Sequence, residues 1–317
     1  MTYNPSILTL TMNPAVGLYT TVETMVTSSK MRCAPAVRDP GGGGINVARA
    51  THRFGANARA VFPAGGALGS VLCELLAAEK VPHVAVSVSG ETRENLTIFE
   101  NSTGREYRFV LEGQPLSQSE IEAVLTALER AKSCDMLVAS GSLPPGVSTG
   151  FFRQLVPVAR GLGARLVIDS SGAALQGALG PGVYLVKPSL REMEALVARK
   201  LPTQMERLAA ARALITAGAA ELVALTLGAE GAMLVSATEA WHAFAPKVDV
   251  ISTVGSGDSF LAAAIMALAQ GTPLSEVVMR GVAGGTAALS APGTKLCQPE
   301  QVDVLMEQIN VTAVVSA

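Results

Sequence analysis

The chain has 317 residues, a formal net charge of −2 at pH 7, 49% hydrophobic residues and only 4% aromatic ones. A near-neutral charge without a basic block excludes nucleic acid as the main partner, and no apolar run reaches the length of a membrane span, which excludes membrane insertion. The length suits one large α/β domain or two small ones, with most of a sizeable core buried.

Short β-branched runs alternate with amphipathic segments, a pattern that predicts a mainly parallel sheet with right-handed crossovers. In chain order we expect strands over 7–11, 58–66, 83–90, 136–142, 165–172, 183–189 and 222–228, and helices over 44–55, 69–80, 117–133, 151–163, 205–218 and much of the chain after 257. The helix over 117–133 begins with a capping box formed by Ser117 and Glu120. Ligands of such sheets bind beyond the carboxyl ends of the strands, where several Gly- and Ser-rich segments lie.

One region breaks this alternation. Residues 95–113 read as two strands around a turn at 101–104, and residues 18–26 also look extended. Together they would form a small separate sheet that serves as a lid or a dimer clasp, or they would be a surface hairpin without a role.

The cysteines and histidines exclude several kinds of site. Cys33, Cys73, Cys134 and Cys297 have no metal or redox spacing, and the three histidines are far apart in the sequence. The N-terminus also lacks the basic and apolar regions of a signal peptide, so we expect a cytoplasmic protein with reduced thiols.

The stretch STVGSGDSF, residues 252–260, places two glycines and Asp258 where a helix begins. A helix N-terminus offers unpaired N–H groups that suit a phosphate, and glycine lets the backbone approach a ligand closely. Asp258 is therefore either a helix cap or a base beside a bound phosphate.

Three further patterns have two interpretations each. The four glycines of DPGGGGINVARA, residues 39–50, are a linker or a close approach to a ligand, with Asn46 near sugar hydroxyls. Glu192 in VKPSLREME begins a solvated helix or orients hydrated Mg²⁺. Lys30, Arg32 and Arg93 are scattered surface cations or together bind a phosphate on the substrate.

PGGGGINVARA near the start and STVGSGDSF near the end together resemble the two signatures of the ribokinase-like (PfkB-type) carbohydrate kinases. Stretches such as FPAGG, SGSLPPGV, LVKPS and GTKLC are similar to the bacterial minor 6-phosphofructokinases within that family. The resemblance implies one kinase domain over 1–317, an α/β three-layer sandwich with a mainly parallel central sheet and a small β-sheet lid at about 15–38 and 93–113. It also implies a cytoplasmic homodimer formed through that lid.

The family resemblance also implies ATP-dependent phosphorylation of a sugar hydroxyl, with Asp258 as the general base. It assigns the other site residues as follows: Gly255, Ser256 and Gly257 to an anion hole; Gly42, Gly43, Gly44 and Asn46 to the sugar; Lys30, Arg32, Arg93 and Ser142 to its 6-phosphate; Lys187, Ser189, Glu192, Thr226 and Gly228 to ATP, with Glu192 acting on Mg²⁺ through water; and Ser252, Val254, Ala288 and Gly293 to K⁺. The expected reaction converts fructose 6-phosphate to fructose 1,6-bisphosphate, with tagatose 6-phosphate or fructose 1-phosphate as alternative substrates.

Two positions depart from the family pattern. Gly17 stands where the family has an aspartate that binds sugar hydroxyls, and Ser189 replaces an asparagine near Mg²⁺. Losing a charge-assisted hydrogen bond costs about 1.5–3 kcal/mol of binding. The alternative from another class is therefore a sugar-phosphate sensor without turnover, but the retained Asp258 and its glycines argue against it.

Overall fold

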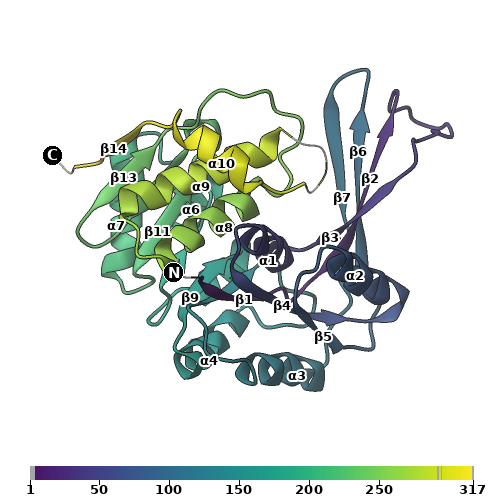
Figure 1. Cartoon of the computed structure of the whole chain (residues 1–317), viewed down its shortest axis with the longest axis horizontal. Helices are drawn as coiled ribbons and strands as arrows, with labels where there is room; N and C mark the ends of the chain where they lie inside the picture. Colours follow the sequence, from purple (N-terminus) through teal and green to yellow (C-terminus); the bar gives the residue numbers. More distant parts are fainter. Residues whose placement is uncertain (1–3, 291–292, 294, 316–317) are drawn as a thin grey trace.

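A computed structural model describes residues 4–290, 293 and 295–315. It contains a large sheet of ten strands and a small sheet of four (Figure 1). The strands of the large sheet, in spatial order, are β14 (Val311–Ala313), β13 (Ala240–Ala243), β12 (Ala232–Val235), β11 (Leu222–Thr226), β10 (Leu185–Val186), β9 (Arg165–Asp169), β8 (Met136–Ser140), β1 (Ser6–Leu10), β4 (Asn57–Ala64) and β5 (His83–Ser87). Pairing is parallel from β11 to β5 and antiparallel from β11 to β14. The predicted mainly parallel α/β sheet is confirmed.

Helices cover both faces of the large sheet. They are α1 (Gly43–Arg53), α2 (Gly66–Ala78), α3 (Gln118–Glu129), α4 (Leu155–Leu162), α5 (Gly172–Ala178), α6 (Leu190–Leu196), α7 (Gln204–Thr216), α8 (Ser256–Ala269), α9 (Leu274–Leu289) and α10 (Pro299–Met306), with short 3₁₀ turns at Phe151–Gln154 and Gly228–Glu230. The Ser117–Glu120 capping box at the start of α3 forms as expected. None of the helices in the described part of the chain has the length and hydropathy that a membrane crossing needs.

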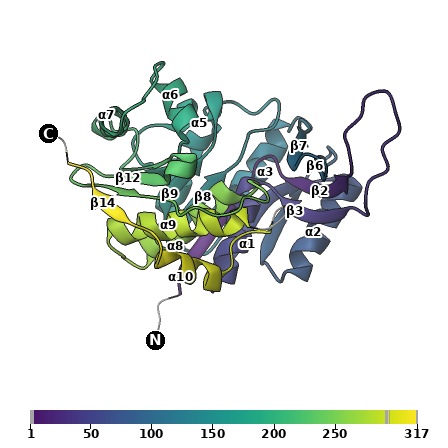
Figure 2. The same ribbon diagram turned by 90° about the horizontal axis from the view of Figure 1, so that it is seen from above.

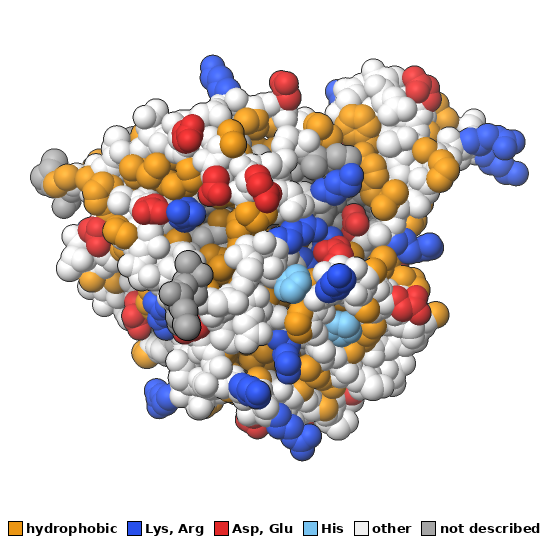
Figure 3. Space-filling model, viewed as in Figure 1, with side chains coloured by type: hydrophobic (Ala, Val, Ile, Leu, Met, Phe, Trp, Pro, Cys, Tyr) orange, Lys and Arg blue, Asp and Glu red, His pale blue; other side chains and the backbone are white. Residues whose placement is uncertain are grey.

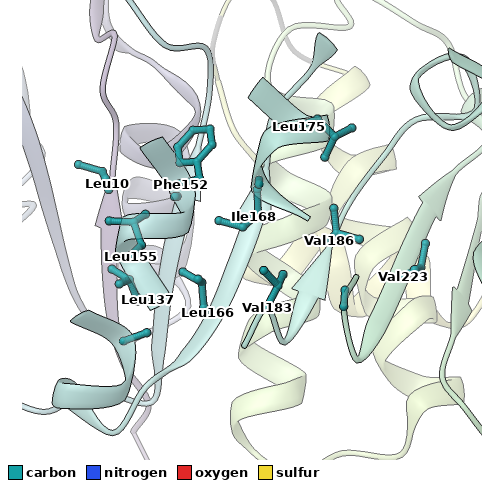
Figure 4. Packing of buried hydrophobic residues seen from close by; sticks show 14 of the residues in the cluster. Leu10, Leu137, Phe152, Leu155, Leu166, Ile168, Leu175, Val183, Val186 and Val223 are labelled. Carbon is teal, nitrogen blue, oxygen red and sulfur yellow. The ribbon is translucent and has the colours of Figure 1, made fainter. Parts of the chain in front are cut away.

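The alternation of strand side chains divides the core into two layers. Leu166 and Ile168 of β9 face α3, α4 and α7, in the layer that Figure 4 shows. Val167, between them, faces the opposite layer under α8 and α9. Both faces of a strand such as β9 are therefore apolar, as parallel strands covered on two sides require.

The small sheet projects from the body and packs on α2. Its strands, in spatial order, are β3 (Val37–Gly41), β2 (Ala15–Val22), β6 (Arg93–Glu100) and β7 (Arg105–Val110). The expected hairpin at 101–104 and the expected extended segment after Leu18 both belong to it. The loop between β2 and β3 extends away from the rest of the molecule (Figure 2).

Candidate active site

A cleft of about 340 Å³ lies between the small sheet and the carboxyl ends of β8 and β9. The small sheet contributes one wall of the cleft, with Arg93 and Arg108 among its side chains. The start of α1, the end of β9 and the start of α8 form the other wall. This is the edge of a parallel sheet where ligands bind.

Asp258 lies in the first turn of α8, at the bottom of this cleft. The residue that caps the helix is Gly255, in a left-handed conformation with φ of 77° that glycine tolerates. The Asp258 carboxylate instead accepts a hydrogen bond from Asn46 Nδ2 of α1, at 2.8 Å. Asp258 is therefore not the cap of its helix, and its carboxylate is held at the cleft by a residue from the glycine-rich segment.

The surroundings of Asp258 favour its protonated form. Burial, followed by the negative charge of Asp169, raises the pKa of Asp258 to about 6. The Asn46 hydrogen bond and the charges of Lys187 and Arg108 act in the opposite direction. A carboxylate with such a pKa can accept a proton near neutral pH, as a general base must.

Lys187 places a positive charge beside the start of α8. Its Nζ lies 3.1 Å from Asp169 Oδ1, and Ser140 Oγ donates to the other oxygen of Asp169 at 3.2 Å. Although burial disfavours the charged form, the neighbouring carboxylates raise the pKa of Lys187 above its usual value. A Cβ placed on Gly257 would stand 3.5 Å from Nζ, so the ammonium and the first N–H groups of α8 converge. This combination can bind an anion.

The glycines at the start of α1 are needed for different structural reasons. Gly42 has φ of 116°, and a Cβ on Gly43 would collide with Ser140 Oγ. Both line the cleft. A Cβ on Gly44 would collide with the backbone of Leu10, so Gly44 is required for packing α1 on β1. The four glycines are thus an ordered, close approach of backbone rather than a linker.

Of the expected phosphate-binding residues, Arg93 and Ser142 line the cleft. Asn13 links Arg93 to Ser142: its backbone carbonyl accepts a hydrogen bond from Arg93 at 2.8 Å, and its side-chain amide donates one to Ser142 Oγ at 3.2 Å. Arg93 Nε is buried without a partner. Lys30 and Arg32 are exposed on the β2–β3 loop and do not line the cleft of their own chain. The sequence did not indicate that this loop points outward.

Comparison with known proteins identifies the family of the chain. The pattern described as "pfkB family carbohydrate kinase" matches residues 10–301. The chain belongs to the pfkB family of carbohydrate kinases. It is 42% identical to the ATP-dependent 6-phosphofructokinase isozyme 2 of Mycobacterium tuberculosis, over 96% of this chain and 89% of that protein. Its identity to the Escherichia coli protein of the same name is 41%, over 92% of this chain and 94% of the other.

The crystal structure of Escherichia coli phosphofructokinase-2 with substrates and products matches this pfkB kinase with a TM-score of 0.91 at 40% identity, covering 96% of this chain and 99% of that one. The same protein has been solved with potassium and as a tetrameric inhibited form. The 1-phosphofructokinase of Bacillus subtilis and the tagatose-6-phosphate kinase of Staphylococcus epidermidis are each 28% identical to this chain. The expected family and fold are confirmed.

The residues expected at the nucleotide lie beside the cleft of this pfkB kinase. Ser189 and Glu192 form a capping box on α6, in which Ser189 Oγ accepts from the Glu192 amide and the Glu192 carboxylate accepts from the Ser189 amide at 2.7 Å. Glu192 also lines the cleft. The interpretation of Glu192 as part of a helix start is thus confirmed by the capping box, and its role at a hydrated metal stays a prediction. Thr226 pairs with Ser189 through a β-bridge, and Gly228 is exposed with φ of 61°.

The residues expected at a potassium site lie around the loop before α8. Ser252 N bonds to the carbonyl of Leu289, the residue after Ala288, which brings this loop against the end of α9. Val254 and Gly293 line the cleft, whereas Ser252 and Ala288 are buried. Part of the expected GTKLC segment, at 294, lies outside the described residues.

Three cleft residues were missed by sequence reasoning. Asp169 is the last residue of the buried strand β9, at the carboxyl edge of the sheet where ligands bind. Arg108 was hidden within the hairpin, where a cation usually faces solvent. Asp39, before the four glycines, belongs to β3 of the small sheet, and no local pattern in the sequence marks it as a cleft residue.

Proposed function

We propose that this chain phosphorylates a hydroxyl of a phosphorylated ketohexose with ATP, and that its substrate is fructose 6-phosphate, which becomes fructose 1,6-bisphosphate. The observation that carries the proposal is the position of Asp258. Its carboxylate has a raised pKa, is held by Asn46, and stands beside Lys187 and the start of α8. Arg93 and Arg108 on the opposite wall suit a substrate that already bears a phosphate. The names of the relatives support the same reaction.

In the proposed mechanism, Asp258 accepts the proton of the sugar hydroxyl as that oxygen attacks the terminal phosphorus of ATP. The bond from this phosphorus to its bridging oxygen breaks, and the electron pair leaves with that oxygen on ADP. The N–H groups of Gly255, Ser256 and Gly257 receive the transferring phosphate, and Lys187 neutralises its charge. Little covalent chemistry is left to the protein, which contributes positioning and electrostatic stabilisation. Asn46 orients the base, and the glycines of α1 shape the space for the sugar.

Mg²⁺ and K⁺ are proposed as the ions of this site. Glu192 would orient hydrated Mg²⁺, which supplies charge neutralisation of the ATP phosphates. Ser189 caps α6 through its hydroxyl, so it would contact that ion only through water. Backbone carbonyls near Ser252, Val254, Ala288 and Gly293 would hold K⁺, and the potassium complex of the Escherichia coli relative supports that assignment. Thr226 and Gly228 would lie along the nucleotide.

The small sheet is proposed as both lid and dimer interface in a cytoplasmic homodimer. Exposed hydrophobic residues gather on it and on its loop, namely Val26, Met31, Val37, Phe109, Val110 and Leu111. Figure 3 shows hydrophobic side chains along the projecting sheet. Such a patch on a soluble protein indicates a partner surface. Lys30 and Arg32 do not line the cleft of their own chain, so they would bind the substrate phosphate only if the dimer brings them to the cleft of the other protomer.

The test is ADP release from MgATP with fructose 6-phosphate, tagatose 6-phosphate, fructose 1-phosphate, fructose and ribose. We expect turnover on fructose 6-phosphate, and a loss of about 10²–10⁴-fold in kcat for Asp258→Asn because the general base is removed. The matched control is Asp303→Asn, an exposed aspartate on α10, which should leave kcat unchanged.

Each contrary outcome assigns a different function. A preference for tagatose 6-phosphate or fructose 1-phosphate would replace the substrate but keep the reaction. Binding of phosphosugar without any ADP release would replace the kinase with a sugar-phosphate sensor.

A further inference from the structure

Four carboxylates line the cleft in the described part of the chain, and the proposed mechanism uses three of them. Asp258 is the base, Asp169 pairs with Lys187, and Glu192 serves α6 and the metal. The fourth, Asp39, belongs to β3 of the small sheet and has no role in that mechanism. Its place in the cleft therefore requires an account of its own.

The strand register places Asp39 on the same face of the small sheet as Gly17, the position where the family has an aspartate that binds sugar hydroxyls. Asp39 lies directly opposite Gly17 in the antiparallel β2–β3 pair, and directly opposite residues point to the same face of a sheet. Tyr19, two residues along β2, shares that face. A Cβ on Gly293 would stand 3.4 Å from Asp39 Oδ2 and 3.6 Å from Tyr19 Cγ, so this face looks across the cleft. All four residues line it.

Gly17 has room for a side chain. It is in an ordinary strand, outside the positive-φ conformations that favour glycine. A Cβ added there would meet only the carbonyl oxygen of Asp39, at an ordinary contact distance of 3.5 Å. Packing therefore does not require glycine at this position, and a substrate hydroxyl has room to approach Asp39.

The charged side chains of the small-sheet wall indicate what Asp39 would bind. The small-sheet wall also carries Arg93 and Arg108, which suit the phosphate of a substrate. The remaining sugar hydroxyls need acceptors, and Asp39 is the carboxylate that this wall supplies. A site whose buried polar group pairs with a substrate hydroxyl strongly rejects analogues that cannot make that bond.

We propose that Asp39 is the hydroxyl acceptor of the sugar subsite, and that it determines which ketohexose phosphate the enzyme accepts in place of a side chain at position 17. This inference rests on the proposed function. It concerns a residue that touches the sugar rather than the phosphate or the nucleotide.

The test compares Asp39→Asn, Gly17→Asp and the double variant with wild type and with Asp303→Asn as a control. For Asp39→Asn we expect a KM for fructose 6-phosphate at least tenfold higher, a kcat within threefold, and an unchanged KM for MgATP and melting temperature. In the double variant, the new carboxylate on the facing strand should return the KM for the phosphosugar toward the wild-type value. The dissociation constant of fructose 6-phosphate, measured by calorimetry without ATP, should follow KM.

Different results would overturn the proposal, and each has its own meaning. A KM within twofold of wild type in Asp39→Asn removes Asp39 from the subsite. Parallel losses in MgATP affinity and melting temperature, without rescue by Gly17→Asp, make it a structural residue. If wild type turns over no sugar, the proposed kinase function fails, and calorimetry decides the role of Asp39 separately: a wild-type chain that binds no phosphosugar overturns it too.

Discussion

At the start of α8, burial and the charge of Asp169 raise the pKa of Asp258 to about 6. The proposed base must be deprotonated to accept the hydroxyl proton, so protonation below this value removes activity. A general base works best with a pKa near the working pH, which the fold achieves here with a half-buried carboxylate. Two predictions at the scale of this residue follow from the direction of the shift.

We expect kcat/KM to be constant above about pH 7 and to fall about tenfold per pH unit below about 6, as the raised pKa of Asp258 requires. Sugar phosphates also titrate near pH 6, because the second phosphate pKa lies there. Fructose, which has no phosphate, is therefore the control substrate at high concentration. A profile with fructose that stays flat down to pH 5 would assign the inflection to the substrate instead of Asp258.

The same shift predicts the effect of Asp258 on stability. Its pKa is higher in the folded state, at about 6, than the usual 3.8, so the folded state binds more protons between these values. Stability contributed by this group is then lost as the pH rises from about 4 to about 6. Asp258→Asn should stabilise the free protein by about 1 to 3 kcal/mol at pH 7.5, and not at pH 3.5. Urea unfolding at the two pH values measures this, and a destabilised variant at pH 7.5 contradicts it.

Arg93 is the cation of the cleft whose side chain is most firmly held, by the carbonyls of Asn13 and Leu111. We expect Arg93→Ala to raise the KM for fructose 6-phosphate about tenfold to a hundredfold, because a charge-assisted contact to phosphate is lost. The KM for MgATP and the slow rate with fructose should stay the same. Arg105→Ala, on the exposed end of β7, is the matched control. Equal losses with fructose and its phosphate would show that Arg93 only supports the small sheet.

At the scale of elements, α6 depends on a capping box that contains the proposed metal-orienting carboxylate. Glutamine can replace glutamate in a capping box, because its carbonyl oxygen also accepts from the N-cap amide. We therefore expect Glu192→Gln to keep the urea midpoint of wild type but to raise the Mg²⁺ concentration for half-maximal rate several-fold. Ser189→Ala is the complementary variant, with a loss of about 1 kcal/mol in stability. A Glu192→Gln protein with normal Mg²⁺ dependence would limit Glu192 to the helix cap.

The helices and strands that could be predicted from the sequence are those marked by a pattern within their own residues. β9 and α3 follow from a buried apolar run and a capped amphipathic helix. The hairpin of β12 and β13 was missed because its short strands are rich in alanine and lack an alternating pattern. β3 was missed because Asp39, Pro40 and Gly41 are typical turn residues; the strand lies at the edge of its sheet, where proline removes no ladder hydrogen bond that a second neighbour needs.

Part of the candidate site could also be predicted from a pattern within neighbouring residues. Asp258 and the glycines around it belong to one contiguous motif. The partnership of Asn46 with Asp258 joins residues 212 positions apart, and the opposition of Gly17 and Asp39 depends on strand register. Neither can be read from spacing in the sequence. The outward position of Lys30 and Arg32 depends on the path of a long loop, which side-chain patterns do not specify.

For the whole molecule, the exposed apolar residues of the small sheet and its loop predict self-association. We expect light scattering to give a dimer or larger oligomer for wild type, and a monomer for the variant Val26→Asp/Met31→Asp, because charges in an apolar interface lose their hydration. Val304→Asp changes a valine on α10 that is more exposed than Val26 or Met31, and it should keep the wild-type mass. A monomeric wild-type chain would leave the small sheet as a lid without an interface.

The order of strands in the large sheet also affects folding during synthesis, because the ribosome makes the chain from its N-terminus. β1 pairs with β4 on one side and with β8 on the other, and each later strand from β8 to β14 is added next to the strand before it. A chain emerging from the ribosome therefore presents each later strand of the large sheet after a neighbour is available, including β8, which returns to β1. Domains generally fold from the N-terminal side during synthesis. The wall formed by the small sheet, complete by β7, is then made well before α8 supplies Asp258, the proposed base.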